Sequence, residues 1–279
     1  MKRKNVQPRV PGDIKGLLID IDGVLYVEKQ LIRGAVETIE YLQKENIPFM
    51  LLTNTTRRSR YSLLANLQQM GFRLDIEQLY TAPYAASLWL KEKNVSTVCL
   101  FVRGDTYREF KDFHVTTNKP EYLVIGDIAE DLTYAYLNQA FRLVMSGTRM
   151  LALQKNRYWQ TNTGLALDTG AVVAALEYAT RKRAIVIGKP NAAFFQHAVK
   201  KLGLPPQHLA VIGDDLESDI AGGNKVGLYT IAVETGKFRD DLLRRKKTMP
   251  DQILPSIAEL PAWLEAQKRA VPAPFPGGE

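Results

Sequence analysis

Residues 17–26 read LLIDIDGVLY, and this stretch decides the fold of the 279-residue chain. Its apolar start predicts a short buried strand, which ends in Asp20 and Asp22 and breaks at Gly23. Ligands of an open α/β sheet bind outside the carboxyl ends of its strands, and burying a carboxylate costs several kcal/mol without a compensating cation or hydrogen bonds. The two acids are therefore interpreted as ligands of a divalent metal, and oxygen donors favour Mg²⁺. The alternative is a polar turn, since Asp-Gly is a common turn pair.

Three further apolar runs predict strands that end in polar residues. They are Phe49–Leu52 before Thr53-Asn54-Thr55, Ala184–Ile187 before Gly188-Lys189-Pro190, and Leu209–Ile212 before Gly213-Asp214-Asp215. Helical spacing follows the first two strands, over residues 34–46 and in a helix that Ser59 is predicted to cap. This alternation predicts a parallel sheet with right-handed crossovers. The strand ends together predict one phosphate-and-metal site.

The order of these motifs resembles the haloacid dehalogenase (HAD) superfamily of phosphotransferases: Asp-x-Asp-Gly, Thr-Asn, Lys, then Gly-Asp-Asp with a further acid at Asp219. The resemblance covers nearly the whole chain, from Gly12 into the 260s. The long interval between Asn54 and Lys189 is similar to the branch with an inserted α/β cap of the C2 type, subfamily IIA. The opening looks like its p-nitrophenyl and nucleotide-monophosphate phosphatases and NagD-like proteins. Residues 164–180 are more similar to the phospholysine phosphohistidine inorganic pyrophosphate phosphatase group.

The resemblance implies an α/β fold, with a Rossmann-like three-layer core around a parallel sheet and an inserted α/β cap domain. The core is expected at residues 1–82 and 183–265, the cap at 83–182, and a disordered tail at 266–279. About 100 residues with alternating elements can build a core of their own, so the insertion is predicted to be a domain. Its predicted elements are strands at Thr97–Val102, Tyr122–Ile125 and Met150–Leu153 and helices from a cap at Asp131 to Met145 and from Gly170 to Thr180.

The resemblance also implies a role for each acid of the first motif. Asp20 would be the nucleophile that forms an aspartyl-phosphate. Asp22 would be the general acid and base, which protonates the leaving oxygen and then deprotonates the hydrolytic water. The Mg²⁺ ligands would be Asp20, Asp214 and the backbone carbonyl of Asp22.

The remaining motifs would bind the phosphoryl group and support the metal. Thr53 and Asn54 would offer a hydroxyl and an amide to phosphoryl oxygens, and Lys189 would offset the accumulated negative charge. Asp215 and Asp219 would hold metal-bound waters or orient Lys189. For Asp215 an alternative is left open, an acid stabilised at a helix amino terminus.

The cap is expected to select the substrate through the segment from Gln154 to Asn162, which is rich in hydrogen-bonding and aromatic side chains. Asn156, Tyr158 and Trp159 are the candidate contacts to the leaving group; a surface loop with half-buried aromatics is the alternative. Sugar-phosphate relatives carry Asn-Pro-Asp near this point, and this chain departs from that pattern. Asp168 could face the substrate, although a helix cap is favoured.

Composition excludes several partners. The net charge of +7 arises from residues 2–9 and 239–247, which fits solvated segments better than a nucleic-acid surface. No stretch approaches the roughly 20 apolar residues that span a membrane, and no apolar run follows the basic amino terminus as in a secretory signal. Cys99, the single cysteine, lies in an apolar run and is expected to be a buried structural thiol. Cytoplasmic localisation is therefore expected.

These features predict a Mg²⁺-dependent phosphatase that hydrolyses a small phosphorylated metabolite, either a phosphate ester, a phosphoramidate or a pyrophosphate. Neither a nucleic acid nor a membrane is an expected partner, and a homodimer through the cap is left open. Two alternatives are a phosphotransferase on the same core and a non-catalytic binding or scaffold protein on a retained fold. The intact set of motif residues argues against the latter.

Overall fold

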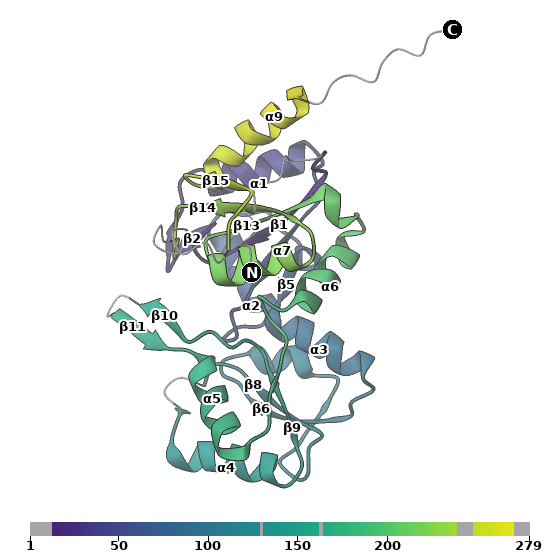
Figure 1. The fold of residues 1–279 in the computed structure, drawn as a ribbon, viewed down its shortest axis with the longest axis vertical. Coiled ribbons are helices and arrows are strands. Elements are labelled where there is room, and N and C mark those ends of the chain that lie inside the picture. The colour runs from purple at the N-terminus through teal and green to yellow at the C-terminus, as the bar shows by residue number, and fades with distance from the viewer. Residues whose placement is uncertain (1–12, 129–130, 162–163, 239–247, 271–279) are drawn as a thin grey trace, which may run out of the picture. The chain divides into compact units, whose positions relative to one another are not determined.

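The computed structural model describes residues 13–128, 131–161, 164–238 and 248–270 (Figure 1). The basic segments at 2–9 and 239–247 and the tail beyond Ala270 lie outside these ranges. The described chain divides into two compact units. The first contains the described residues within Met1–Leu51, Gly71–Arg73 and Ala198–Glu279, and the second contains those within Leu52–Met70 and Leu74–His197. The predicted domain limits at 82/83 and 182/183 stay a prediction.

The first sheet has the strand order β15-β14-β13-β1-β4-β5. Its strands are β1 (Gly16–Asp20), β4 (Phe49–Thr53), β5 (Leu79–Thr81), β13 (Leu209–Gly213), β14 (Tyr229–Val233) and β15 (Gln252–Leu254). In the first unit β1 pairs parallel with β13, and β13 with β14, as the alternation predicts. The register places Ile19 opposite Ile212, so β1 and β13 end side by side.

Helices follow the strands of the first unit. They are α1 (Ala35–Lys44), a π-helix (Leu216–Ile220), α7 (Ala221–Lys225), α9 (Leu260–Ala270) and short 3-10 turns at Pro206–His208 and Ile257–Glu259. A two-stranded ribbon, β2 (Tyr26–Val27) with β3 (Gln30–Leu31), follows the first motif. Because α9 continues to Ala270, the prediction of disorder is wrong for residues 266–270. The apolar spacing of Leu260 and Leu264 buries one face of that helix.

The second unit contains a five-stranded sheet with the order β12-β9-β8-β6-β7. Its strands are β6 (Thr97–Phe101), β7 (His114–Val115), β8 (Tyr122–Ile125), β9 (Arg149–Ala152) and β12 (Ile185–Val186), and the pairs within it are parallel. The three strands predicted for the insertion are confirmed. The run at 184–187, expected among the core strands, instead forms β12 on β9. Backbone hydrogen bonds from Ile187 to Ala152 and from Gly188 to Leu153 extend that pairing.

The helices of the second unit begin at capped positions. They are α2 (Arg60–Gln69), α3 (Ala82–Glu92), α4 (Tyr134–Met145) and α5 (Thr169–Thr180), with 3-10 turns at Ile76–Gln78 and Thr106–Phe110; α6 (Ala192–Leu202) crosses into the first unit. Ser59 caps α2, as predicted. The cap of α4 is Thr133, whose hydroxyl accepts the Tyr136 amide, so the prediction of Asp131 is wrong. Thr133, two residues later, has the extended backbone and the accepting side-chain oxygen that an N-cap requires.

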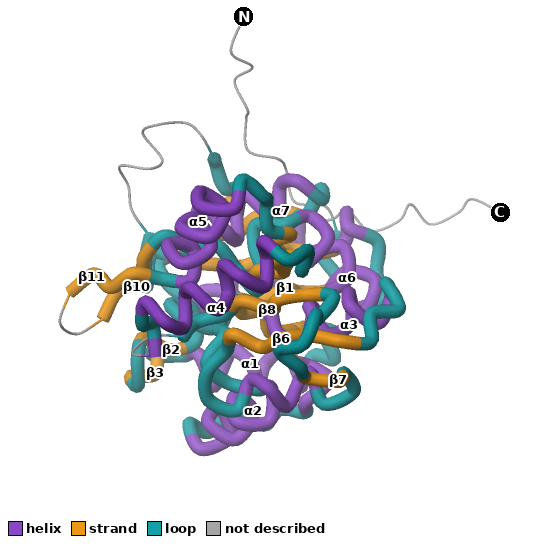
Figure 2. The backbone as a smooth tube through the Cα atoms, turned by 90° about the horizontal axis from the view of Figure 1, so that it is seen from below, coloured by secondary structure: helices purple, strands orange, loops and turns teal. Residues whose placement is uncertain are grey.

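Helices α4 and α5 lie next to one another in the second unit (Figure 2). They share an apolar core with the five-stranded sheet, in which Cys99 is buried beside Leu123 and Val173. Burial raises the pKa of the Cys99 thiol to about 11, which confirms the structural thiol. This unit therefore has a hydrophobic core of its own.

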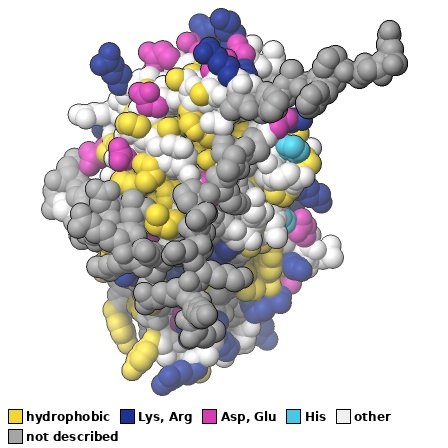
Figure 3. Space-filling model, turned by 45° about the horizontal axis from the view of Figure 1, so that its top comes forward, with side chains coloured by type: hydrophobic (Ala, Val, Ile, Leu, Met, Phe, Trp, Pro, Cys, Tyr) yellow, Lys and Arg dark blue, Asp and Glu magenta, His cyan; other side chains and the backbone are white. Residues whose placement is uncertain are grey.

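None of the helices within the described ranges is long and apolar enough to cross a membrane. On the face drawn in Figure 3, lysine and arginine side chains are scattered among aspartate and glutamate.

Candidate active site

Three acids of the first unit come together and are named here the acidic cluster: Asp20, Asp214 and Asp219. One carboxylate oxygen from each lies within 4.8 Å of the others, and among the described residues no other group of this kind occurs. The side chains are buried, with residue exposures of 6, 1 and 1%. Two of the three predicted strand-end acids are thus adjacent, and Asp219, expected only to support them, is as close as they are.

Local structure explains how each acid reaches the cluster. Asp20 is the last residue of β1, and Asp214 follows Gly213, the last residue of the neighbouring β13. Asp219 lies on the π-helix that follows, five residues further on. Its side chain packs on Gly213, where an added Cβ would lie 2.3 Å from the Asp219 Cβ. Because Gly213 has no side chain, Asp219 on the π-helix can pack against the end of β13.

Electrostatics in the cluster favour a cation. Burial, and then the charge of Asp20, raise the pKa of Asp214 to about 7. The backbone amide of Lys237 donates to Asp214 Oδ2 at 2.6 Å and opposes this shift only in part. Three buried carboxylates are hard oxygen donors whose mutual repulsion a divalent cation would relieve, so the donor set fits Mg²⁺.

A loop after β14 encloses Asp214, and the sequence reasoning missed it. A Cβ added at Gly236 would lie 2.1 Å from Asp214 Oδ2, and one at Gly23 would lie 2.0 Å from the same atom. Both glycines have positive φ, 63° and 87°. The Thr235 hydroxyl donates to the Gly23 carbonyl and joins the two turns. The sequence does contain a hint of this loop: Gly236 follows the end of β14, and β14 is the strand next to β13, which leads to Asp214.

Asp22 and Asp215 lie outside the acidic cluster. Asp22 is exposed, and its backbone forms an isolated β-bridge with Tyr26. Asp215 caps the π-helix: its Oδ1 accepts the amides of Glu217 at 2.9 Å and Ser218 at 3.2 Å. Its own amide donates to Asp219 Oδ2 at 3.3 Å. The alternative left open for Asp215, an acid at a helix amino terminus, is therefore confirmed, and that cap also touches the acidic cluster.

Thr53, Asn54 and Lys189 come together in the second unit and are named here the lysine cluster. The Asn54 Oδ1 accepts the Lys189 amide at 2.8 Å, and the Asn54 Nδ2 donates to the Lys189 carbonyl at 2.9 Å. Gly188 allows this approach, because a Cβ there would lie 2.4 Å from Asn54 Oδ1. Thr53 and Lys189 are buried, and the Thr53 hydroxyl accepts the Thr55 amide at 2.9 Å. Asn54 thus positions Lys189, a contact that sequence spacing did not indicate.

The candidate specificity residues lie at the start of the hairpin formed by β10 (Tyr158–Thr161) and β11 (Gly164–Leu167). Tyr158 is 45% exposed, and Trp159 is half-buried with the Arg57 guanidinium 4.8 Å from its ring centroid. The Asn156 carbonyl accepts the Gly170 amide at 2.9 Å, which ties this segment to α5. Asp168 caps α5 by accepting the Thr169 amide at 2.7 Å, so the favoured helix-cap reading is confirmed.

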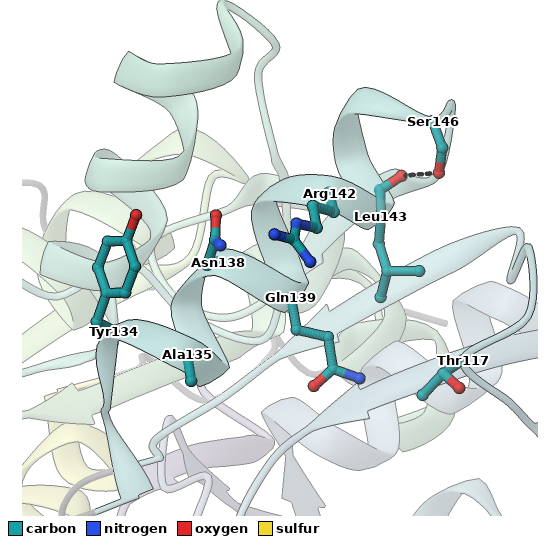
Figure 4. Close-up of a pocket in the computed structure, with 8 residues that line it drawn as sticks. All are labelled: Thr117, Tyr134, Ala135, Asn138, Gln139, Arg142, Leu143 and Ser146. Atoms are coloured by element: carbon teal, nitrogen blue, oxygen red, sulfur yellow. Dashed lines mark hydrogen bonds between the residues drawn. The ribbon is translucent and has the colours of Figure 1, made fainter.

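A separate hollow of about 670 Å³ lies along α4 in the second unit (Figure 4). None of the predicted site residues lines it. Its walls are Thr117, Tyr134, Ala135, Asn138, Gln139, Arg142, Leu143 and Ser146. Without a buried charged group or an acid among these side chains, the hollow lacks the chemistry of the predicted reaction.

Family comparisons agree with the motifs. A haloacid dehalogenase-like hydrolase model matches residues 17–116, and a HAD-hydrolase-like model matches residues 186–260. Human haloacid dehalogenase-like hydrolase domain-containing protein 2 is 37% identical over 81% of this chain and 86% of its own length. Human phospholysine phosphohistidine inorganic pyrophosphate phosphatase is 32% identical over 88% of this chain and 92% of its own.

Solved structures show the same fold. A p-nitrophenyl phosphatase from Archaeoglobus fulgidus has a TM-score of 0.85 at 27% identity, covering 91% of this chain and 100% of that one. NagD from E. coli K-12 has a TM-score of 0.81 at 25% identity, covering 89% and 98%. The expected fold, a HAD-like α/β architecture, and the expected enzyme class, a phosphatase of this kind, are confirmed. The chain belongs to the haloacid dehalogenase-like hydrolase family.

Proposed function

We propose that the protein is a Mg²⁺-dependent phosphatase that hydrolyses small phosphorylated molecules through a covalent aspartyl-phosphate on Asp20. The observation that carries the proposal is the acidic cluster, three buried carboxylates within 4.8 Å of one another. Burying like charges so closely is unfavourable unless a cation accompanies them.

The metal would be held by Asp20, Asp214 and Asp219, with the backbone carbonyl of Asp22 as a further ligand. When bound, Mg²⁺ supplies positive charge that keeps carboxylates and phosphoryl oxygens together. Asp215, as the cap of the π-helix and the donor to Asp219, holds that acid in place. The enclosing loop does the same for Asp214 through the Lys237 amide.

The chemistry of the chain's own residues takes two steps. A carboxylate oxygen of Asp20 attacks phosphorus, the bond to the leaving oxygen breaks, and Asp22 gives that oxygen a proton. Asp22 then accepts a proton from water as the water attacks the phosphorus of the acyl-phosphate, which releases inorganic phosphate and restores Asp20. Asp22, which is exposed, therefore ends each turnover protonated and ready to act as the acid again. Thr53, Asn54 and Lys189 would hold the phosphoryl oxygens, with Lys189 fixed by Asn54.

The substrate class follows from relatives and from the second unit. The phosphatase relative acts, by its name, on phospholysine, phosphohistidine and inorganic pyrophosphate, and another relative acts on p-nitrophenyl phosphate. We propose small phosphate esters, phosphoramidates or pyrophosphate for this chain, in a cytoplasmic setting. We also propose a homodimer that forms through the predicted cap domain, residues 83–182.

The test measures hydrolysis of p-nitrophenyl phosphate after metal removal with a chelator. Activity should vanish and return with Mg²⁺, because the acidic cluster needs the cation. In Asp20→Asn, turnover should fall by about 10⁴-fold or more, and no acid-stable phosphoenzyme should form, since the attacking oxygen is gone. The matched control is Asp112→Asn, an exposed carboxylate paired with Lys91, which should retain activity. Full activity in excess chelator, or phosphorylation of the Asp20→Asn protein at position 20, would contradict the proposal.

A further inference from the structure

The loop after β4 is bonded to the segments that follow two strands of the five-stranded sheet, β8 and β6. The Thr56 hydroxyl accepts the Asp127 amide at 2.9 Å, just after β8. The Thr106 hydroxyl donates to the Thr56 carbonyl at 2.8 Å, and Thr106 begins the 3-10 turn that follows β6. The loop that begins with Thr53 is therefore a fixed part of the second unit, to which the β10–β11 hairpin also belongs.

Arg57 joins this loop to the hairpin. Its Nε donates to Asp127 Oδ2, and its guanidinium lies 4.8 Å from the ring centroid of Trp159. The Asp127 side chain is only 14% exposed, so this ion pair is worth more than a solvated surface pair, whereas the Arg57 side chain keeps 40% of its surface exposed. The Arg57 backbone packs against Gly104, where an added Cβ would lie 2.3 Å from the Arg57 carbonyl oxygen.

We propose that Arg57 is a positioning residue for substrate selectivity: it holds Trp159 in a fixed place relative to the loop that begins at Thr53. This inference rests on the proposed phosphatase function and deepens it. A planar guanidinium can bond a carboxylate through one edge while its face lies on an indole, and an ammonium has neither that fork nor that flat face. Arg57 acts through Trp159, and selectivity among leaving groups depends on the contact between them.

The first experiment compares kcat/KM for two substrates with different leaving groups, p-nitrophenyl phosphate and inorganic pyrophosphate. Arg57→Lys and Trp159→Ala should each change the ratio of the two values by about two- to fivefold, in the same direction, given the strength of a partly exposed cation–π contact. The double variant should change it no more than the larger single change, because both remove one contact. Asp127→Asn should produce a smaller change of the same sign.

The matched control is Lys93→Gln. Lys93 makes the same kind of contact with Trp89, at 5.8 Å, elsewhere in the second unit, and its loss should leave the ratio unchanged. Equal losses for both substrates in Arg57→Lys, or additive effects in the double variant, would overturn the inference. Parent protein without any Mg²⁺-dependent hydrolysis would overturn the proposed function itself, so the two failures are distinguishable.

A second readout does not depend on activity. Arg57→Lys should shift the tryptophan emission maximum of the parent but leave that of Trp159→Phe unchanged, since the arginine contact involves this indole alone. Lys93→Gln should shift emission in both backgrounds through Trp89. An equal shift from Arg57→Lys in the parent and in Trp159→Phe would contradict the contact on which the inference depends.

Discussion

The acidic cluster and the lysine cluster are both built where strands end, yet they are stabilised in opposite ways. Asp20, Asp214 and Asp219 bring like charges together, and burial raises the pKa of Asp214. In the lysine cluster, the amide of Asn54 bonds both backbone groups of Lys189, at 2.8 and 2.9 Å. Under the proposed function, a cation from solution completes the acidic cluster, whereas the chain itself completes the lysine cluster.

This difference predicts which changes of metal, pH and sequence each cluster tolerates. An arrangement held by internal hydrogen bonds is formed as soon as the chain folds and is independent of salt and metal. An arrangement of buried like charges depends on the ion, on pH and on the glycines that give the acids room. Substitutions around the acidic cluster should therefore act through metal affinity, and those around the lysine cluster should not.

After substitution of the nucleophile, the largest loss of activity is expected at Asp22. This substitution separates proton transfer from metal binding at the acidic cluster. Asp22→Asn should lower kcat by about 10²–10⁴-fold, the usual contribution of a positioned acid or base. Its carboxylate lies outside the acidic cluster and its backbone carbonyl is unchanged, so Mg²⁺ affinity should stay within a factor of about two. Steady-state kinetics and a Mg²⁺ titration check this. Loss of Mg²⁺ affinity as large as the loss in kcat would show that Asp22 acts mainly as a ligand.

A smaller effect is expected at the glycine that encloses Asp214. In Gly236→Ala, the new Cβ would collide with Asp214 Oδ2, and Mg²⁺ affinity should fall about 10–100-fold, as on loss of outer-shell support. The control is Gly227→Ala, which has a similar positive φ, 79°, but no atom within 4 Å of the new Cβ. It should cost about 1–2 kcal/mol of stability from backbone strain and leave Mg²⁺ affinity unchanged. Thermal unfolding with and without Mg²⁺ measures both. Equal effects of the two substitutions on affinity would break the comparison.

Much of this arrangement could be predicted from the sequence, because it depends on local apolar runs. The strands that end at Asp20, Thr53 and Gly213 each contain three or four consecutive apolar residues, and these runs predict them. Such runs bury themselves wherever they lie in the chain, and the polar residue after each run then reaches the sheet edge.

What could not be predicted depends on contacts between distant segments. Asp219 reaches the acidic cluster only because a π-helix follows Gly213, and no residue pattern indicates that helix type. The two residues of β12 carry too little information to choose between two sheets. The loop at residues 235–237 contributes a backbone amide, which any residue type but proline could supply.

Calorimetric titration of Mg²⁺ into metal-free protein tests the central claim most directly, that the acidic cluster is completed by a cation and the lysine cluster is not. Because the pKa of Asp214 is raised to about 7 by burial and by Asp20, the folded protein holds a proton there at lower pH, and Mg²⁺ must displace it. A raised folded-state pKa means that the metal-free fold loses stability as pH rises from the ordinary carboxyl range to about 7. Mg²⁺ affinity should rise over the same interval.

The titration is run at pH 6 and pH 8 in buffers of different ionisation enthalpy, on the parent, on Asp214→Asn and on Asn54→Ala. We expect one Mg²⁺ site in the parent, with proton release at pH 6 that disappears at pH 8. Asp214→Asn should lose both the site and the proton release, and Asn54→Ala should keep both. Mg²⁺ binding that survives in Asp214→Asn, or that disappears in Asn54→Ala while the protein stays folded, would contradict the account.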